Sequence, residues 1–339
     1  MQRYCGSFAT VALLVVFAIF EDVPSFAATK EVCLYADSRG VVHQVNSWGE
    51  VPESFRTTSK CLGASQNQYM APPEQVTLKG NVREELISSS LGRIRLRWPR
   101  SAETLFGRTP QRAMSDAATT VARVLKGGGF PPAVQTLNRD WQVVFMDETL
   151  PEAQIPQYLI SNCHPAWMTP PSNLYVVAQR IAAGCSGGRG GPSRVNDAQL
   201  SQVLIHEMGH VVEYAILGSH GGEDRMRAEG FASWFEQYGS DFSSINTKGA
   251  ARKFYSELAR QSFAQSPEGF NFQGSAYDYA RASMYFRAVV AKRGIRGLMD
   301  VYQTMIDEDT NFFGAVQRRF NWSLAQFNTE ARRVLESGK

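Results

Sequence analysis

One short segment combines residue types and a spacing that suit a metal ion, namely His206-Glu207-Met208-Gly209-His210. On an α-helix, residues four apart share a face, so both imidazoles can reach one ion. Glu207 lies beside that face, where its carboxylate can address a water molecule held by the metal. Coincidence or a metal-free relic is the alternative, but a chain with only five histidines rarely produces this spacing by chance. The segment therefore predicts a metal site.

A helix over residues 196–217 must position this segment, and the local sequence predicts one. Asn196 or Asp197 can cap its N-terminus, and Gly218 follows its last apolar residue. Apolar residues also recur at helical spacing on the side opposite the histidines. These residues are Leu204, Met208, Val211 and Ala215. We expect this stripe to hold the helix against a core.

A hydrolytic zinc site needs a third protein ligand and an open position for water. Glu229 is the best candidate, because it falls nineteen residues after His210, which lets one helix end and a second cross it. Gly209 and Gly230 lack side chains and would let those two helices approach closely.

Other residues are alternatives for the third ligand. His220 lies ten residues after His210 in a Gly-Ser-His-Gly-Gly turn, and Glu223 and Glu236 are further carboxylates. A histidine six residues after His210 would complete a different pattern, but that position is Ile216.

The motif, together with Glu229-Gly230-Phe231-Ala232 and Glu236, resembles the gluzincin metallopeptidases, in particular the peptidase MA-like group of compact bacterial domains. The resemblance extends over about residues 93–336 and includes the helix that starts near Tyr277 and a closing segment at 320–327. It implies a zinc peptidase with one zinc ion per chain, bound by His206, His210 and Glu229.

The resemblance also implies roles in hydrolysis. Glu207 would be the general base, taking a proton from water and passing it to the leaving amine. Tyr277 or Tyr279 would donate a hydrogen bond to the developing oxyanion, with simple helix packing as an equal alternative for both. His164, in a loop between Cys163 and Pro165, is a further candidate donor.

One position departs from the family's pattern. Many gluzincins carry an aspartate four residues after the glutamate ligand, where it orients a zinc histidine, and this chain has Ser233 there. Support for the ligands must then come from elsewhere, which bears on metal affinity.

The elements expected around the site define an α+β fold over residues 93–339. Strands are expected at 93–98, 141–146 and 174–177, a helix at 114–125, and a proline-rich crossing at 151–171. Apolar periodicity after the motif helix predicts a mainly helical part. Its helices are expected at 224–238, 250–261, 276–292, 295–306 and 323–335. The domain is thus predicted to join a small sheet, an active-site helix and a helical C-terminal part.

Residues 1–28 predict a signal peptide. Arg3 supplies the positive start, residues 8–20 supply an apolar run, and Ala27 or Ala28 offers a cleavage site. An apolar run of this length is short for a membrane span, so an uncleaved anchor is the lesser alternative. We expect a bacterial protein exported to the periplasm or secreted, with no stable membrane span after cleavage.

Residues 29–63 predict a small β-hairpin module with strands at 32–35 and 41–45. The pattern from Tyr35 through Gly40 to His43 resembles a small domain of unknown function in bacterial secreted proteins. Such a module could dock a partner or inhibit the site. Residues 64–92 are polar, contain Pro72-Pro73, and are expected to be a linker.

Composition and cysteines narrow the class of protein. A hydrophobic content of 43% and a charged content of 20% are globular values, and a net charge of +3 is too small to indicate a nucleic-acid partner. Sequence proximity favours disulfides between Cys33 and Cys61 and between Cys163 and Cys185 in an oxidising compartment. The absence of a C-x-x-C spacing argues against a cysteine zinc site.

Three functions fit these observations. The first is an exported zinc endopeptidase that acts on a protein or peptide substrate. The second is a catalytically silent gluzincin-fold protein that binds or scaffolds partners in the cell envelope. The third is a zinc hydrolase that acts on a non-peptide amide. An intact Glu207 argues against the second function, since a relic has no need of it. The sequence assigns no oligomeric state.

Overall fold

The computed structural model describes residues 32–36, 42–45, 60–62, 78, 81–100, 109–146, 165–177, 180–181, 195–218, 224–267 and 270–338. For residues 32–62 it describes the backbone alone. The chain divides into two compact units, one within Phe20–Ala71 and one that contains Pro72–Lys339. The predicted signal peptide, Cys163 and Cys185 lie outside the described residues.

The smaller unit contains a three-stranded antiparallel sheet of β1 (Val32–Ala36), β2 (Val42–Val45) and β3 (Lys60–Leu62), in the order β2-β1-β3. The two strands expected at 32–35 and 41–45 are confirmed as β1 and β2, while β3 was not predicted. Cys33 on β1 faces Cys61 on β3 in the register of the two strands. Cα atoms of such opposed residues lie about 4.5–5.5 Å apart, within the range that a disulfide spans. The Cys33–Cys61 bond stays a prediction.

The larger unit contains a five-stranded mixed sheet. Its strands are β4 (Val82–Ser89), β5 (Gly92–Pro99), β6 (Arg139–Met146), β7 (Ala166–Thr169) and β8 (Asn173–Val177). In the order β4-β5-β6-β8-β7, the three central strands are parallel and both outer strands run antiparallel to their neighbours. The strands expected at 93–98, 141–146 and 174–177 are confirmed as β5, β6 and β8.

Two strands lie where the sequence predicted none. β4 occupies the end of the segment expected to be a linker, so that expectation is wrong for residues 82–89. This strand is half exposed and rich in polar residues, and its Glu84 lies 3.2 Å from Arg95 and 3.6 Å from Arg97 across the strand pair. β7 lies in the expected proline-rich crossing. Short or charged edge strands carry little hydrophobic alternation, which hides them in the sequence.

The remaining elements are helices, and the predicted α+β class is confirmed. They are α2 (Thr109–Gly127), α3 (Pro132–Gln135), α6 (Asp197–Leu217), α7 (Arg225–Ser240), α8 (Ala250–Gln265), α9 (Ala276–Glu308), α10 (Phe312–Phe320) and α11 (Leu324–Ser337). α9 contains the break expected between its two halves, because Gly294 adopts a φ of 68°. The two short helices α3 and α10 were not predicted. None of the helices in the described part of the chain has both the length and the apolar character needed to cross a membrane.

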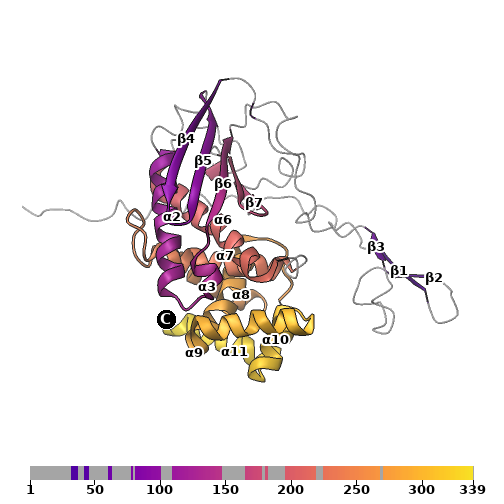
Figure 1. The fold of residues 1–339 in the computed structure, drawn as a ribbon. Coiled ribbons are helices and arrows are strands. Elements are labelled where there is room, and N and C mark those ends of the chain that lie inside the picture. Colours follow the sequence, from indigo (N-terminus) through magenta and orange to yellow (C-terminus); the bar gives the residue numbers. More distant parts are fainter. Residues whose placement is uncertain are drawn as a thin grey trace, which may run out of the picture. The chain divides into compact units, whose positions relative to one another are not determined.

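The helix with the histidines, α6, lies in the centre of the larger unit. It packs against α2 on one side and α7 on the other, and α7 packs in turn against α9 (Figure 1). Leu204, Met208 and Val211 of the predicted stripe are fully buried, whereas Ala215 is partly exposed. Aromatic side chains of α7, α9, α10 and α11 pack against one another in the core.

Two glycines set how closely these helices approach. A methyl group on Gly209 would lie 3.2 Å from Cα of Ala232, so this glycine admits α7 against α6 as expected. Gly230 faces a different neighbour than predicted. A methyl group there would lie 2.8 Å from the ring of Phe286 and 3.0 Å from Cβ of Ala282, both on α9. The correction follows from helix geometry, because Gly230 follows Glu229 directly and must point away from it by about 100°.

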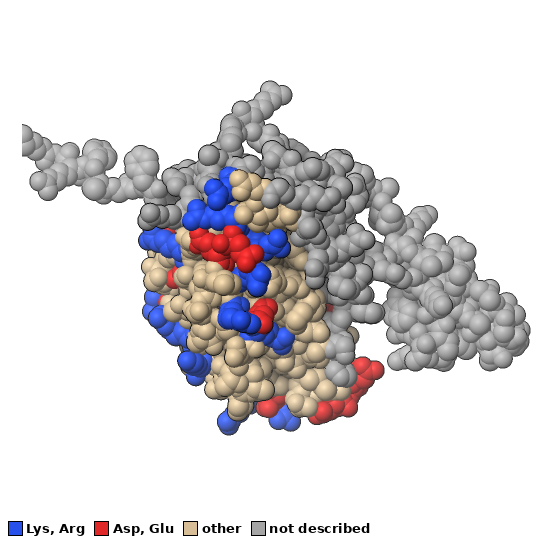
Figure 2. Space-filling view, turned by 45° about the horizontal axis from the view of Figure 1, so that its top comes forward, with Lys and Arg blue, Asp and Glu red and all other residues tan. Residues whose placement is uncertain are grey.

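A buried ion pair joins the same three helices. Nη1 of Arg227 on α7 lies 2.7 Å from Oε1 of Glu213 on α6, and the hydroxyl of Tyr302 on α9 donates to the same oxygen at 2.6 Å. Arg227 and Glu213 are both almost completely buried. Removal of one partner would leave an uncompensated charge in the core. On the face drawn in Figure 2, the charges of the described residues are instead mixed, with acidic and basic side chains in small groups.

Candidate metal centre

Two helices bring the predicted ligands together. α6 begins with Asn196, whose side chain accepts a hydrogen bond from the backbone N–H of Gln199 at 3.0 Å, and ends at Gly218. α7 begins with Asp224, whose carboxylate accepts from the N–H of Arg227 at 2.9 Å. These caps fix where each helix starts and therefore which face each one turns to the other.

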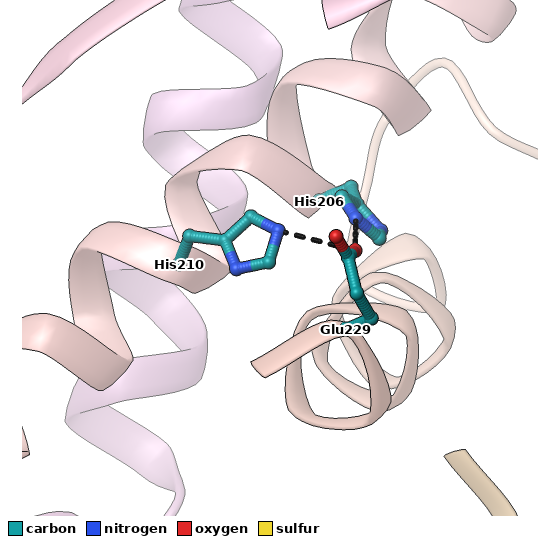
Figure 3. Close-up of side chains that lie close together, drawn as sticks. All are labelled: His206, His210 and Glu229. Atoms are coloured by element: carbon teal, nitrogen blue, oxygen red, sulfur yellow. Dashed lines mark hydrogen bonds and ion pairs between the residues drawn. The ribbon is translucent and has the colours of Figure 1, made fainter. Parts of the chain in front are cut away.

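The three residues His206, His210 and Glu229 form one cluster (Figure 3). Oε2 of Glu229 lies 3.3 Å from Nε2 of His206 and 3.5 Å from Nε2 of His210, and all the potential ligand atoms lie within 4.8 Å of one another. Ligand bonds of about 2.0–2.2 Å in a tetrahedral zinc site place ligand atoms about 3.3–3.5 Å apart. Two imidazoles and one carboxylate at these separations fit a zinc ion and leave one position open.

Hydrogen bonding within the cluster shifts the pKa values of Glu229 and His206. Burial alone would raise the pKa of Glu229, but the hydrogen bonds and charges of His206 and His210 outweigh it and lower this pKa well below its usual value. Burial would likewise lower the pKa of His206, but its hydrogen bonds to Glu229 and Glu236 raise it to about 10. Without a metal ion, a proton on the imidazole therefore holds the carboxylates in place.

Glu236, an alternative third ligand, lies on the far side of His206. Its Oε2 is 3.2 Å from Nδ1 of that histidine and accepts a hydrogen bond from the hydroxyl of Tyr255 on α8 at 2.7 Å. Glu229 faces the other ring nitrogen. Carboxylates in such a position fix the orientation and tautomer of a metal-binding histidine. Sequence reasoning missed Tyr255, for which no local signal exists.

Glu207 is the predicted general base, and its side chain is 6% exposed. Among the described residues, its Oε2 has no hydrogen-bond partner. Burial is the main reason that its pKa is raised, and the charges of Glu229 and Glu236 raise it further against the opposing effect of the histidines. A carboxyl group with a raised pKa and an oxygen that lacks a hydrogen-bond partner is a candidate proton acceptor.

Of the two candidate tyrosines, the structure places Tyr279 at the cluster. Its ring lies 6.4 Å from the imidazole of His206, centroid to centroid, with 29° between the two ring planes. Burial, and next the charge of Glu229, raise the pKa of Tyr279, so the hydroxyl keeps its proton. Tyr277 is two residues earlier on α9, which turns its side chain about 200° away from that of Tyr279.

Arg225 also reaches the cluster, although no pattern in the sequence indicates it. Its Nη2 donates to the hydroxyl of Tyr279 at 3.4 Å, and its Nε lies 4.0 Å from Oε1 of Glu229. His164, His220 and Glu223, the remaining alternatives, lie outside the described residues.

Comparisons with known proteins give structural matches but no sequence match. No protein-family model matches the sequence. No curated protein matches it either. Among solved structures, the chain is similar to an aminopeptidase N family protein from Idiomarina loihiensis, with 10% sequence identity and a TM-score of 0.35 over 93% of this chain. The chain spans about half of that structure, 49% of its length. A similarity at this level assigns no function.

Proposed function

We propose that the protein is an exported zinc-dependent endopeptidase. The observation that carries the proposal is the convergence of His206, His210 and Glu229, with the carboxylate of Glu207 beside them. A set of two imidazoles and one carboxylate is typical of catalytic zinc sites that keep a fourth position open. Export is supported by the sequence of residues 1–28.

The bound metal would supply Lewis acidity toward a carbonyl oxygen and lower the pKa of water to about 7. Glu207 would accept a proton at Oε2, the oxygen without a partner among the described residues, and return it to the leaving amine. Tyr279 would donate its hydroxyl proton in a hydrogen bond to the oxygen on which negative charge develops. Its raised pKa supports this role, since only the protonated hydroxyl can donate.

The burial of Glu207 favours catalysis over a silent binding role. A buried carboxylate without a hydrogen bond costs stability. A protein that only binds partners would lose nothing by replacing this residue, whereas a hydrolase needs a base at this position.

Metal analysis and digestion of a peptide library test the proposal. We expect the mature protein to contain one zinc ion and to cleave peptides. Cleavage should stop when a chelator removes the metal. The Glu207→Gln variant preserves the shape of the side chain and is expected to keep the zinc and lose hydrolysis. Cleavage by that variant would refute the assignment of the base. A zinc-loaded wild type that cleaves no peptide would refute the peptidase.

A further inference from the structure

Arg225 stands one helical turn before Glu229 on α7, at the edge of the metal cluster. Besides its contacts with Tyr279 and Glu229, its guanidinium carbon lies 5.7 Å from the centre of the Phe272 ring. The backbone at Gly274 approaches it from the same segment. A methyl group on Gly274 would lie 3.1–3.3 Å from Nη2, Cζ and Nη1 of the guanidinium.

These contacts hold the guanidinium in one place. Phe272 offers a ring face, Tyr279 offers a hydrogen-bond acceptor, and the missing side chain at Gly274 leaves the space that the group occupies. A planar cation held in this way loses little conformational entropy when it binds a ligand.

Exposure distinguishes Arg225 from its neighbours. Its side chain is 40% exposed, whereas the side chains of His206 and Glu229 are each 13% exposed. Arg227, two residues later on the same helix, is almost completely buried against Glu213. Arg225 therefore presents a positive charge to solvent directly beside the predicted ligands.

We propose that Arg225 binds a carboxylate of the substrate next to the scissile bond, and so determines specificity. The inference rests on the proposed function and deepens it. The guanidinium fork matches a carboxylate in two parallel hydrogen bonds, and such pairs are stronger than hydrogen bonds between neutral groups. We assign the carboxylate to an acidic side chain, as an endopeptidase requires, and peptides with a free or amidated C-terminus distinguish it from the end of the chain.

A purely structural role for Arg225 would have a different signature. Through Tyr279 and Glu229 the guanidinium could support the metal site itself. Its loss would then weaken zinc binding and affect all peptides alike. If Arg225 instead binds a substrate carboxylate, its loss should weaken binding and cleavage only of peptides that carry that carboxylate.

The test compares hexapeptides that differ in one group. Peptides with Glu or Gln on either side of the cleaved bond, and peptides with a free or amidated C-terminus, are digested by wild type, Arg225→Gln and Arg225→Lys. Binding of the same peptides to the zinc-loaded Glu207→Gln protein, with and without Arg225→Gln, is measured by calorimetry. Arg95→Gln is the matched control, because Arg95 is 48% exposed and belongs to the sheet.

We expect the carboxylate peptide to be bound and cleaved about 10–100-fold better than its amide twin. Arg225→Gln should bring this ratio near one with an unchanged zinc content. Arg225→Lys should keep part of the preference for the carboxylate peptide. Arg95→Gln should keep the full preference. A ratio that survives Arg225→Gln overturns the inference, as does an equal loss for both twins. Absent cleavage with retained carboxylate-dependent binding would refute the peptidase and leave Arg225 as the carboxylate site.

Discussion

Oε2 of Glu236 lies 3.2 Å from Nδ1 of His206, while Glu229 faces Nε2 of the same imidazole. The histidine is thus held between two carboxylates of one helix, seven residues apart. Tyr255 fixes the outer carboxylate from α8. Ser233, fully buried between the two glutamates on α7, lacks the carboxylate that many gluzincins carry there. Glu236 is thus positioned to orient His206, which a serine at position 233 does not do.

Glu236→Gln is expected to lower zinc affinity about 10–100-fold, because the neutral amide accepts a weaker hydrogen bond from Nδ1–H of His206 than the carboxylate does. Competition with a chromogenic chelator measures the affinity. Glu257→Gln on α8 is the control, since Glu257 is exposed and pairs with Arg260. Glu236→Asp should bind zinc more tightly than Glu236→Gln. Equal affinity of wild type and Glu236→Gln would show that His206 needs no such support.

The sequence predicts those parts of the site that depend on local spacing. Both histidines lie on one helix four residues apart, so spacing alone indicates His206 and His210 as ligands. The distance to Glu229 suits a second helix and makes it the best of several candidates for the third ligand. The helix between caps at 196 and 218 was likewise predictable. Strong periodicity predicted α7, α8, α9 and α11 for the same reason.

The rest depends on contacts between distant segments. Whether Glu236 would bind metal or support a histidine depends on the angle at which α7 crosses α6, which no local pattern encodes. Arg225 reaches Tyr279 across 54 residues of sequence. β4 carries the charged alternation of an edge strand, and its pairing with β5 is visible only when the sheet forms.

Glu229→Ala is expected to release zinc on dialysis, because the two histidines alone leave a site with two open positions. Metal content of the dialysed protein, by atomic absorption, provides the measurement. His220→Ala should keep its zinc and is the control. Full zinc content in Glu229→Ala, with loss in His220→Ala or Glu223→Ala, would move the third ligand to one of those residues.

Tyr279→Phe is expected to lower kcat about 100-fold with unchanged zinc content, since it removes a hydrogen-bond donor to the developing oxyanion. Tyr277→Phe is the matched control on the same helix and should leave kcat little changed, because its side chain points away from Tyr279. Initial rates of cleavage of one peptide substrate by the two variants decide which tyrosine is the donor. The opposite ranking of the two variants would reverse the assignment.

The surroundings of Asp116, a residue outside the metal cluster, lead us to expect that the free energy of unfolding depends on pH. On α2, its carboxylate accepts hydrogen bonds from the hydroxyl of Ser201 on α6 at 2.7 Å, from the hydroxyl of Ser243 at 2.6 Å, and from the backbone and hydroxyl of Ser244 at 2.8 Å. Burial alone would raise the pKa of Asp116, but these four hydrogen bonds outweigh it and lower the pKa.

A lowered pKa in the folded state means that Asp116 stabilises the fold fully above its unfolded pKa of about 3.9, and loses that contribution as the pH falls through the folded value. Asp116→Asn should therefore reduce the free energy of unfolding by about 2 kcal/mol at pH 7, because an amide cannot accept all four hydrogen bonds. The difference between the two proteins should shrink below pH 4, as followed by urea unfolding between pH 2.5 and 7. Asp140→Asn, at an exposed pair with Arg93, should change stability little. A difference that stays constant down to pH 2.5 would contradict the role of the Asp116 charge.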